Sequence, residues 1–209
     1  MLIKATMTTL IKINKIKLII IALLVIATII TTIDPEYPNE QFLQHLGTLI
    51  ISLVLLVDIK RKKLKLAPFI GVALFILIHI IGARWIYSFV PYEDWLNTLF
   101  RWELNSPRNH YDRFVHFSFG ILILPYLFEL FSTLKIKKVV KVIIAWAILQ
   151  SLSVFYEIFE WILTLINGDI ATDYNGQQGD VWDAQKDMAL AMLGSTITAV
   201  FHLLFKRKK

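Results

Sequence analysis

The chain of 209 residues contains no cysteine. Disulfides and thiolate ligands are therefore excluded, and any metal site or catalysis must use carboxylate, imidazole, hydroxyl or amide groups. The sequence also lacks a stretch for a separate soluble domain, because the longest connection between apolar segments, 91–113, has only 23 residues. It contains no internal repeat and no low-complexity segment. These absences favour a single domain over residues 1–209.

Apolar residues are the excess in this composition. They make up 56% of the chain, give a mean hydropathy of +0.61 and occur in long runs rather than in alternation. A helix rises 1.5 Å per residue and must cross an apolar bilayer core of roughly 30 Å. The sequence therefore predicts an all-α, polytopic membrane helix bundle in contact with the lipid bilayer. Its six expected spans are approximately 16–33, 43–59, 66–90, 114–134, 139–166 and 183–205.

Basic residues flank these runs in four clusters, which hold seventeen of the 22 lysines and arginines. The clusters lie near residues 4–17, 60–65, 135–141 and 206–209. Because basic loops stay on the cytoplasmic side, both termini are predicted to be cytoplasmic. The net charge of +6 is explained by topology, so we expect no nucleic-acid partner. The acidic connections at 34–42, 91–113 and 167–182 are expected to face outward.

Two outward connections have features of their own. In 91–113, aromatic and leucine residues recur at helical spacing beside charges, which predicts an amphipathic helix along the membrane surface. The segment 167–180 is rich in glycine, aspartate and amide residues. It can close over a ligand or form a simple turn.

Acidic and histidine residues lie within or beside the predicted spans, where burial of a charge is costly. Spacings of three, four and seven residues place each group on one helical face. The groups are Asp112 with His116, Glu157 with Glu160, and Asp180 with Asp183 and Asp187. Counted from the cytoplasmic end, His116, Glu157 and Glu160 come about 20–27 Å up. The sequence therefore predicts a polar site in the outer half of the bundle.

The chemistry of this site has two interpretations. Carboxylates with an imidazole can hold a divalent cation, and carboxylates in unlike environments can share acid and base roles. The candidate catalytic residues and metal ligands are His116, Glu157, Glu160 and Asp187. The candidate binding residues are Asp112, Arg113, Arg84, Asp183 and Gln185. A divalent metal ion is thus the candidate cofactor, and the spacing does not decide between the two chemistries.

Each polar group also has a purely structural explanation. These explanations are a helix cap at Asp112 and Arg113, an interhelical hydrogen bond of His116, ion pairs of Glu157 or Glu160 with Arg84 or Arg113, and capping or solvation of Asp183 and Asp187 beside Lys186. The last predicted span adds Ala191, Gly194 and Thr198 on its acidic face. Small residues allow helices to approach closely, so we expect this face to pack inward.

Three ordered motifs give the chain a family resemblance. They are Tyr111-Asp112-Arg113-Phe114-Val115-His116-Phe117, Tyr156-Glu157-Ile158-Phe159-Glu160-Trp161 and Gln178-Gly179-Asp180-Val181-Trp182-Asp183-Ala184-Gln185-Lys186-Asp187-Met188. With these motifs the region 66–205 resembles the bacterial inner-membrane YjdF family, which implies a multi-pass membrane protein and assigns no activity.

A more distant similarity is to VanZ-like membrane proteins. The matching pattern is Asp112-Arg113-x-x-His116-Phe117, then Glu157, then Asp187 ahead of Gly194. This similarity implies work on the cell envelope at the outer face. The chain departs from the pattern in its second membrane acid, Glu160, and in the Trp182-Asp183-x-Gln185 insertion.

Three functions remain open. The first is a membrane enzyme or binding protein for a lipid-linked or other anionic, phosphate-bearing molecule, since Arg84, Arg108 and Arg113 can meet an anion. The second is a proton- or cation-coupled transporter. The cytoplasmic halves of the spans disfavour it, because they are almost wholly apolar apart from Gln150 and Glu129. The third is a non-catalytic scaffold whose polar residues serve helix association.

Overall fold

The fold is an all-helical bundle, as the sequence predicts. A computed structural model describes residues 2–61, 64–167 and 176–205. These residues form seven helices and no strand. The helices are α1 (Leu2–Thr31), α2 (Pro38–Arg61), α3 (Leu66–Arg84), α4 (Tyr92–Phe100), α5 (Tyr111–Leu130), α6 (Lys138–Asn167) and α8 (Asp183–Phe205). All except α4 are long and apolar enough to cross a membrane, α1 from Ile13 onward.

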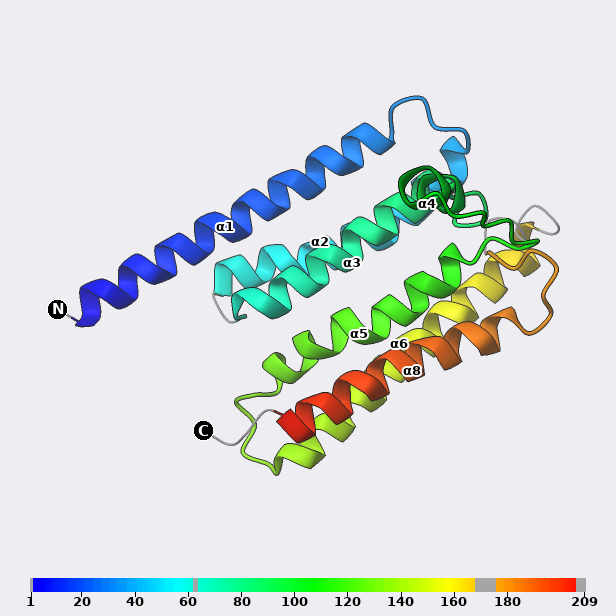
Figure 1. The fold of residues 1–209 in the computed structure, drawn as a ribbon. Helices are drawn as coiled ribbons and strands as arrows, with labels where there is room; N and C mark the ends of the chain where they lie inside the picture. Colours follow the sequence, from blue (N-terminus) through cyan, green and yellow to red (C-terminus); the bar gives the residue numbers. More distant parts are fainter. Residues whose placement is uncertain (1, 62–63, 168–175, 206–209) are drawn as a thin grey trace.

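The spanning helices form two groups of three that lie side by side (Figure 1). In the first group α3 packs against both α1 and α2, and in the second α8 packs against both α5 and α6. Contact between α3 and α5 joins the groups. The start of α1 and the end of α8 lie at one end of the bundle, and α4 lies at the other. Which side of the membrane each end faces stays a prediction.

The third span ends earlier than predicted. The expectation of 66–90 is wrong at its C-terminal end, because α3 stops at Arg84. Ile86 and Tyr87 take left-handed φ values of 43° and 60°, and Tyr87 N donates to Gly82 O at 2.8 Å. A Cβ on Gly82 would lie 2.7 Å from the Tyr87 ring, so glycine makes room for the returning chain. Hydrophobicity does not mark this reversal, because the reversed residues are themselves apolar and buried.

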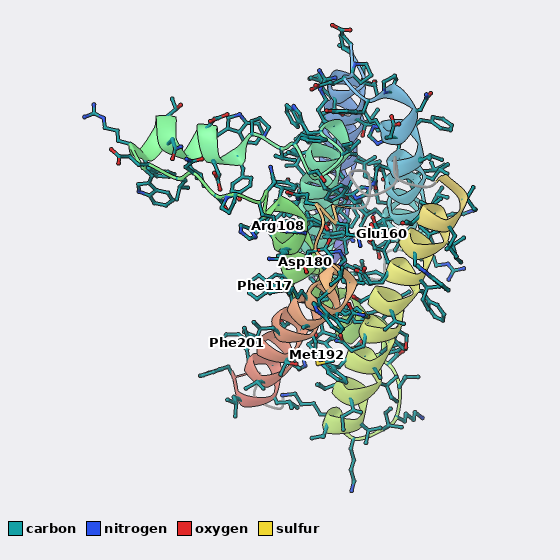
Figure 2. All side chains as sticks on the ribbon, turned by 90° about the vertical axis from the view of Figure 1, so that its right-hand side faces the viewer. Arg108, Phe117, Glu160, Asp180, Met192 and Phe201 are labelled. Atoms are coloured by element: carbon teal, nitrogen blue, oxygen red, sulfur yellow. The ribbon has the colours of Figure 1, made fainter. Side chains whose placement is uncertain are left out.

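Helix α4 confirms the predicted amphipathic helix. It projects sideways from the bundle and contains no buried residue (Figure 2). The chain returns to the bundle close to the point where it left, since Asn109 Nδ2 donates to Val90 O at 2.8 Å. Its position along a membrane surface stays a prediction.

The contact between α5 and α8 is very close. A Cβ on Gly120 would lie 2.3 Å from Ala191 O, and one on Gly194 would lie 2.4 Å from Phe117 O. Ala191 is fully buried. The prediction that the small-residue face of the last span packs inward is therefore confirmed. This contact fixes the acidic residues of α8 against those of α5.

A buried ion pair joins α1 to the end of α2. Lys17 is 1% exposed, and its Nζ donates to Asp58 Oδ2 and to Leu64 O, both at 2.7 Å. The other Asp58 oxygen accepts a hydrogen bond from Leu64 N at 2.7 Å. Lys17 belongs to a basic cluster that the sequence explains by topology alone, and its structural role was not predicted.

Candidate functional site

Three helices of the second group bring six buried polar side chains together, which we call the acidic cluster. The residues are Asp112 and His116 on α5, Glu157 and Glu160 on α6, and Asp183 and Asp187 on α8. The cluster lies toward the α4 end of the bundle, where Figure 2 shows Glu160, Arg108 and Asp180 at a similar level, with Met192 and Phe201 farther along α8. Helical spacing therefore identified residues that come together in three dimensions.

Asp112, His116 and Asp187 have the geometry of a cation site. Each offers one ligand atom, and these atoms all lie within 4.8 Å of one another. His116 Nε2 is 3.6 Å from Asp112 Oδ1 and 3.4 Å from Glu157 Oε1. Two carboxylates and an imidazole, with Glu157 adjacent, form a donor set that suits a divalent cation.

Several carboxylate oxygens of the cluster lack a hydrogen-bond partner among the described residues. They are Asp112 Oδ2, Glu157 Oε1 and Asp187 Oδ1. A buried polar atom without a partner costs free energy, so such atoms need an explanation. Here three such oxygens belong to carboxylates of one cluster, and Glu157 Oε1 lies 3.4 Å from the His116 imidazole, which distinguishes the cluster from an isolated packing defect.

The nearby arginines are occupied at one edge of the cluster. Arg108 donates through Nη1 to Gln177 O at 2.6 Å, through Nη2 to Gly176 O at 2.8 Å, and also to Asp183. Arg113 Nη2 donates to Asp180 Oδ2 at 2.6 Å and lies 3.6 Å from Asp183 Oδ1. Arg113 thus pairs with these aspartates rather than with Glu157.

The structure does not bring Arg84 to the acidic cluster. Its guanidinium donates to the carbonyls of Thr31, Ile33 and Asp34 at 2.7–3.0 Å, between the end of α1 and the start of α2. Its role in the described structure is to close that connection. An anion-binding role for Arg84 beside the cluster therefore has no support from its contacts.

The chain before α8 covers the cluster. Gly176 has a φ of +74°, and a Cβ there would fall 2.5 Å from Asp112 Oδ2. Asn109 N donates to Gln178 Oε1 at 2.9 Å, while Gln178 Nε2 donates to Asn109 O at 3.0 Å. This reciprocal pair holds the two connections together. Of the segment 167–180 predicted to close over a ligand, residues 168–175 lie outside the described residues.

Asp180 anchors the same covering segment. Lys186 Nζ and Trp182 N donate to it at 2.6 Å and 3.1 Å. The Lys186 hydrogen bond is the main reason that the pKa of Asp180 falls to about 2, with Trp182 and Arg113 contributing. Lys186 therefore pairs with Asp180, not with the cluster acids Asp183 and Asp187 beside it in sequence. Asp180 is a permanently charged anchor at neutral pH.

Two cavities adjoin the acidic cluster, each of about 280 Å³; Glu157 lines one and His116 lines the other. We call them the polar cavity and the apolar cavity. The polar cavity is lined by Glu157, Glu160, Trp161, Thr164, Gln177, Val181, Asp183, Ala184 and Gln185. The apolar cavity is lined by Gly47, Ile50, Ile51, Phe75, His79, Tyr87, Asp112, Val115, His116, Phe119, Leu152, Ser153 and Tyr156. The acidic cluster thus contributes to the walls of both.

Sequence reasoning missed the residues that hold the cover in place. Asn109, Gly176 and Gln178 were not among the candidate site residues, and Arg108 was considered only as an anion ligand. The composition of the segment indicated turns, but a pairing between residues 69 apart has no local signal. The exposed Gln185 does line the polar cavity, as its selection as a binding residue would require.

Comparison with known proteins agrees with the fold. The chain is 29% identical over 163 residues to inner membrane protein YjdF of Escherichia coli (strain K12), and the match covers 74% of each protein. No solved structure matches. The similarity to VanZ-like proteins stays a prediction. Residues 16–208 match the family described as predicted membrane protein (DUF2238), so this multi-pass membrane protein belongs to that family.

Proposed function

We propose that this protein binds a divalent cation at Asp112, His116 and Asp187 and uses it to bind or act on a lipid-linked, phosphate-bearing molecule. The observation that carries the proposal is that Asp112, His116 and Asp187 bring ligand atoms within 4.8 Å of one another, in a cluster with three buried carboxylate oxygens that lack a partner among the described residues. A cation would supply the partner that these oxygens lack.

The charge balance favours a cation as the first ligand. The two arginines at the edge of the cluster already bind Asp180, Asp183 and backbone carbonyls. An anion entering alone would meet the open carboxylates of Asp112, Glu157 and Asp187 and would be repelled. A bound cation reverses this balance, because it neutralises the carboxylates and presents positive charge to a phosphate oxygen.

The remaining acids have roles that fit this arrangement. Glu157 lies beside His116 and lines the polar cavity, so it can complete the ligand set or accept a proton. Glu160 lines the same cavity. A bound divalent cation polarises a phosphoryl oxygen as a Lewis acid, and the polar cavity offers space for the group that carries this oxygen.

The test is direct measurement of cation binding by the detergent-purified chain. Metal content and calorimetric titration with Zn²⁺ and Mn²⁺ are compared between wild type and the variants Asp112→Asn, His116→Ala and Asp187→Asn. Losing even an outer-shell partner costs about 10–100-fold in metal affinity, so each variant should lose at least that much. Glu129→Gln is the matched control, because Glu129 lies on α5 but pairs with Lys65 at 3.0 Å.

Two outcomes would overturn the proposal. One is a well-folded wild type that binds neither cation, and the other is unchanged affinity in Asp187→Asn. In the first case, proteoliposome flux that depends on Glu157 would identify a proton-coupled carrier instead. Unaltered phenotype in a strain carrying both Asp187→Asn and Glu157→Gln would favour a scaffold.

A further inference from the structure

The apolar cavity is lined in part by exposed apolar side chains of α2 and α6. Ile50 on α2 is 64% exposed and Leu152 on α6 is 46% exposed, and both line the cavity. Helix α2 packs on α1 and α3, whereas α6 packs on α5 and α8. The cavity therefore lies at the junction between the two groups of helices, with exposed apolar side chains at its edge.

The cavity extends from the acidic cluster toward the middle of the bundle. Asp112 and His116 lie at one end of its wall, and Phe119 and Phe75 also line it. At 1.5 Å per residue, the lining residues Asp112 and Phe119 are about 10.5 Å apart along α5, and Phe75 and His79 are about 6 Å apart along α3. The cavity is thus elongated enough to follow part of a hydrocarbon chain that runs parallel to the helices.

The chemistry of the wall favours a hydrocarbon occupant. Apolar and aromatic side chains dominate it, and a space with this lining is unfavourable for water. Polar atoms occur at the cluster end and at His79, Tyr87 and Ser153, and the His79 ring is hydrogen-bonded to Gln44 O and to the Tyr87 hydroxyl. Ligand pockets of this type combine an apolar wall with a few convergent polar groups.

We propose that the apolar cavity holds one acyl chain of a membrane phospholipid, with the phosphate directed toward the cation site of Asp112, His116 and Asp187. The expected position of the phosphate at the cation site rests on the proposed function. The charges are complementary, because the phosphate is anionic and the cation is the group that it would meet. The occupant enters sideways from the bilayer, past Ile50 and Leu152, and needs no aqueous path.

The test uses a phospholipid with a diazirine in the middle of one acyl chain, incorporated with the purified protein into phosphatidylethanolamine and phosphatidylglycerol vesicles. After illumination, adducts are mapped by mass spectrometry. Phe75 is 6% exposed, so labelling there requires a chain inside the cavity. Phe201 on α8 is 63% exposed and reports contact with bulk lipid. The expected result is labelling of both residues in the wild type.

A larger side chain in the cavity should reduce labelling of Phe75 without reducing labelling of Phe201. Ser153 is buried, lines the cavity and has no hydrogen-bond partner for its Oγ among the described residues, so Ser153→Trp should reduce labelling of Phe75 relative to Phe201 by about tenfold. Ser151→Trp is the matched control on the same helix, because Ser151 is exposed. Ile50→Trp at the exposed edge is a second blocking variant that does not disturb the core. Equal labelling of Phe75 in wild type and in a folded blocking variant would overturn the inference.

The contact between the phosphate and the cation site is tested separately. In Asp187→Asn, or after chelation, labelling of Phe75 by the phospholipid should fall several-fold, while a diazirine hydrocarbon without phosphate should label as before. Unchanged phospholipid labelling would overturn the link to the cation site. Zn²⁺ binding is measured on the same samples. Intact cation binding with no cavity labelling refutes this inference alone, and cavity labelling without cation binding refutes the proposed function.

Discussion

The two groups of helices treat buried charge in opposite ways. In the first group the ammonium of Lys17 meets the carboxylate of Asp58, and Leu64 satisfies the remaining donor and acceptor. In the second group the cluster acids are packed against one another, and only Asp183 among them pairs with arginine in the described contacts. The Lys17–Asp58 pair therefore holds helices together, whereas the crowding of acids in the acidic cluster opposes folding.

Both groups contain acids within apolar segments, so burial alone does not distinguish them. What differs is the kind of neighbour that each acid meets. A buried charge with a full set of partners stabilises its own geometry, whereas buried acids crowded against one another destabilise the fold and are expected at functional sites. Four substitutions test this difference between the two groups.

The largest expected effect is in the first group. Lys17→Met leaves Asp58 as an uncompensated buried charge, which should destabilise the protein by about 3–5 kcal/mol. Unfolding in mixed detergent and SDS micelles measures the change. The double variant Lys17→Met with Asp58→Asn should recover at least half of the loss, because asparagine still accepts from Leu64 N. A single variant as stable as the wild type would contradict the structural role of the pair.

The next effect is at the close contact in the second group. Gly194→Val places side-chain carbon against Phe117 O, and overpacking of this kind should cost about 1–3 kcal/mol. The same unfolding assay measures it. Leu193→Val is the control, since Leu193 is 51% exposed on the same helix and should change stability by less than about 0.5 kcal/mol. Equal stability of the two variants would show that α5 and α8 separate easily.

Asp187→Asn should act in the opposite direction from Lys17→Met. Removing one of several crowded carboxylates should stabilise the cation-free protein by on the order of 1 kcal/mol, as is common where a site trades stability for function. Thermal unfolding without Zn²⁺ measures the stability of the cation-free protein, and unfolding with Zn²⁺ measures the added stabilisation by the cation, which the variant should lose. Destabilisation comparable to Lys17→Met would mean that Asp187 is a structural ion-pair partner and would remove the contrast.

The smallest effect concerns the anchor of the cover. The pKa of Asp180 lies below its ordinary value of 3.8, at about 2. A lowered folded pKa favours folding through the ionised form, so the contribution is complete above pH 3.8 and is lost as the pH falls through 2. Hydrogen exchange of residues 176–182 should therefore be faster in Asp180→Asn than in wild type at pH 6. Loss of wild-type protection already between pH 6 and 5 would contradict this assignment.

The sequence predicted the helices and the grouping of acids well, because both follow from simple periodicity. Apolar runs of sufficient length predict spans, and spacings of three and four place Asp112 with His116 and Glu157 with Glu160. The end of α3 was not predictable in this way. Its reversal depends on left-handed backbone at Ile86 and Tyr87 beside Gly82, within a run that stays apolar.

The sequence also did not predict which charged side chains pair with one another. The sequence offered Arg84 and Arg113 as partners for Glu157 and Glu160, but charge and approximate depth do not specify which side chains meet. In the structure Arg84 binds carbonyls after α1, and Arg113 binds Asp180. The ion pair of Lys17 was missed because its basic cluster already had an explanation. A lone acid such as Asp58 at the end of an apolar span was the available signal.

The hydrogen bond between Asn109 and Val90 has a mechanical consequence. It joins the two points at which the chain leaves and re-enters the bundle around α4, and Tyr92 Oη accepts from His110 N at 3.1 Å beside it. The segment that contains α4 is thus a loop whose two ends are held together. Arg108 is adjacent to Asn109 in sequence, so its hydrogen bonds to Asp183, Gly176 and Gln177 start from the closed ends of this segment rather than from α4 itself. The closure thus places the residue that fastens the cover next to the bundle, whatever surface α4 meets.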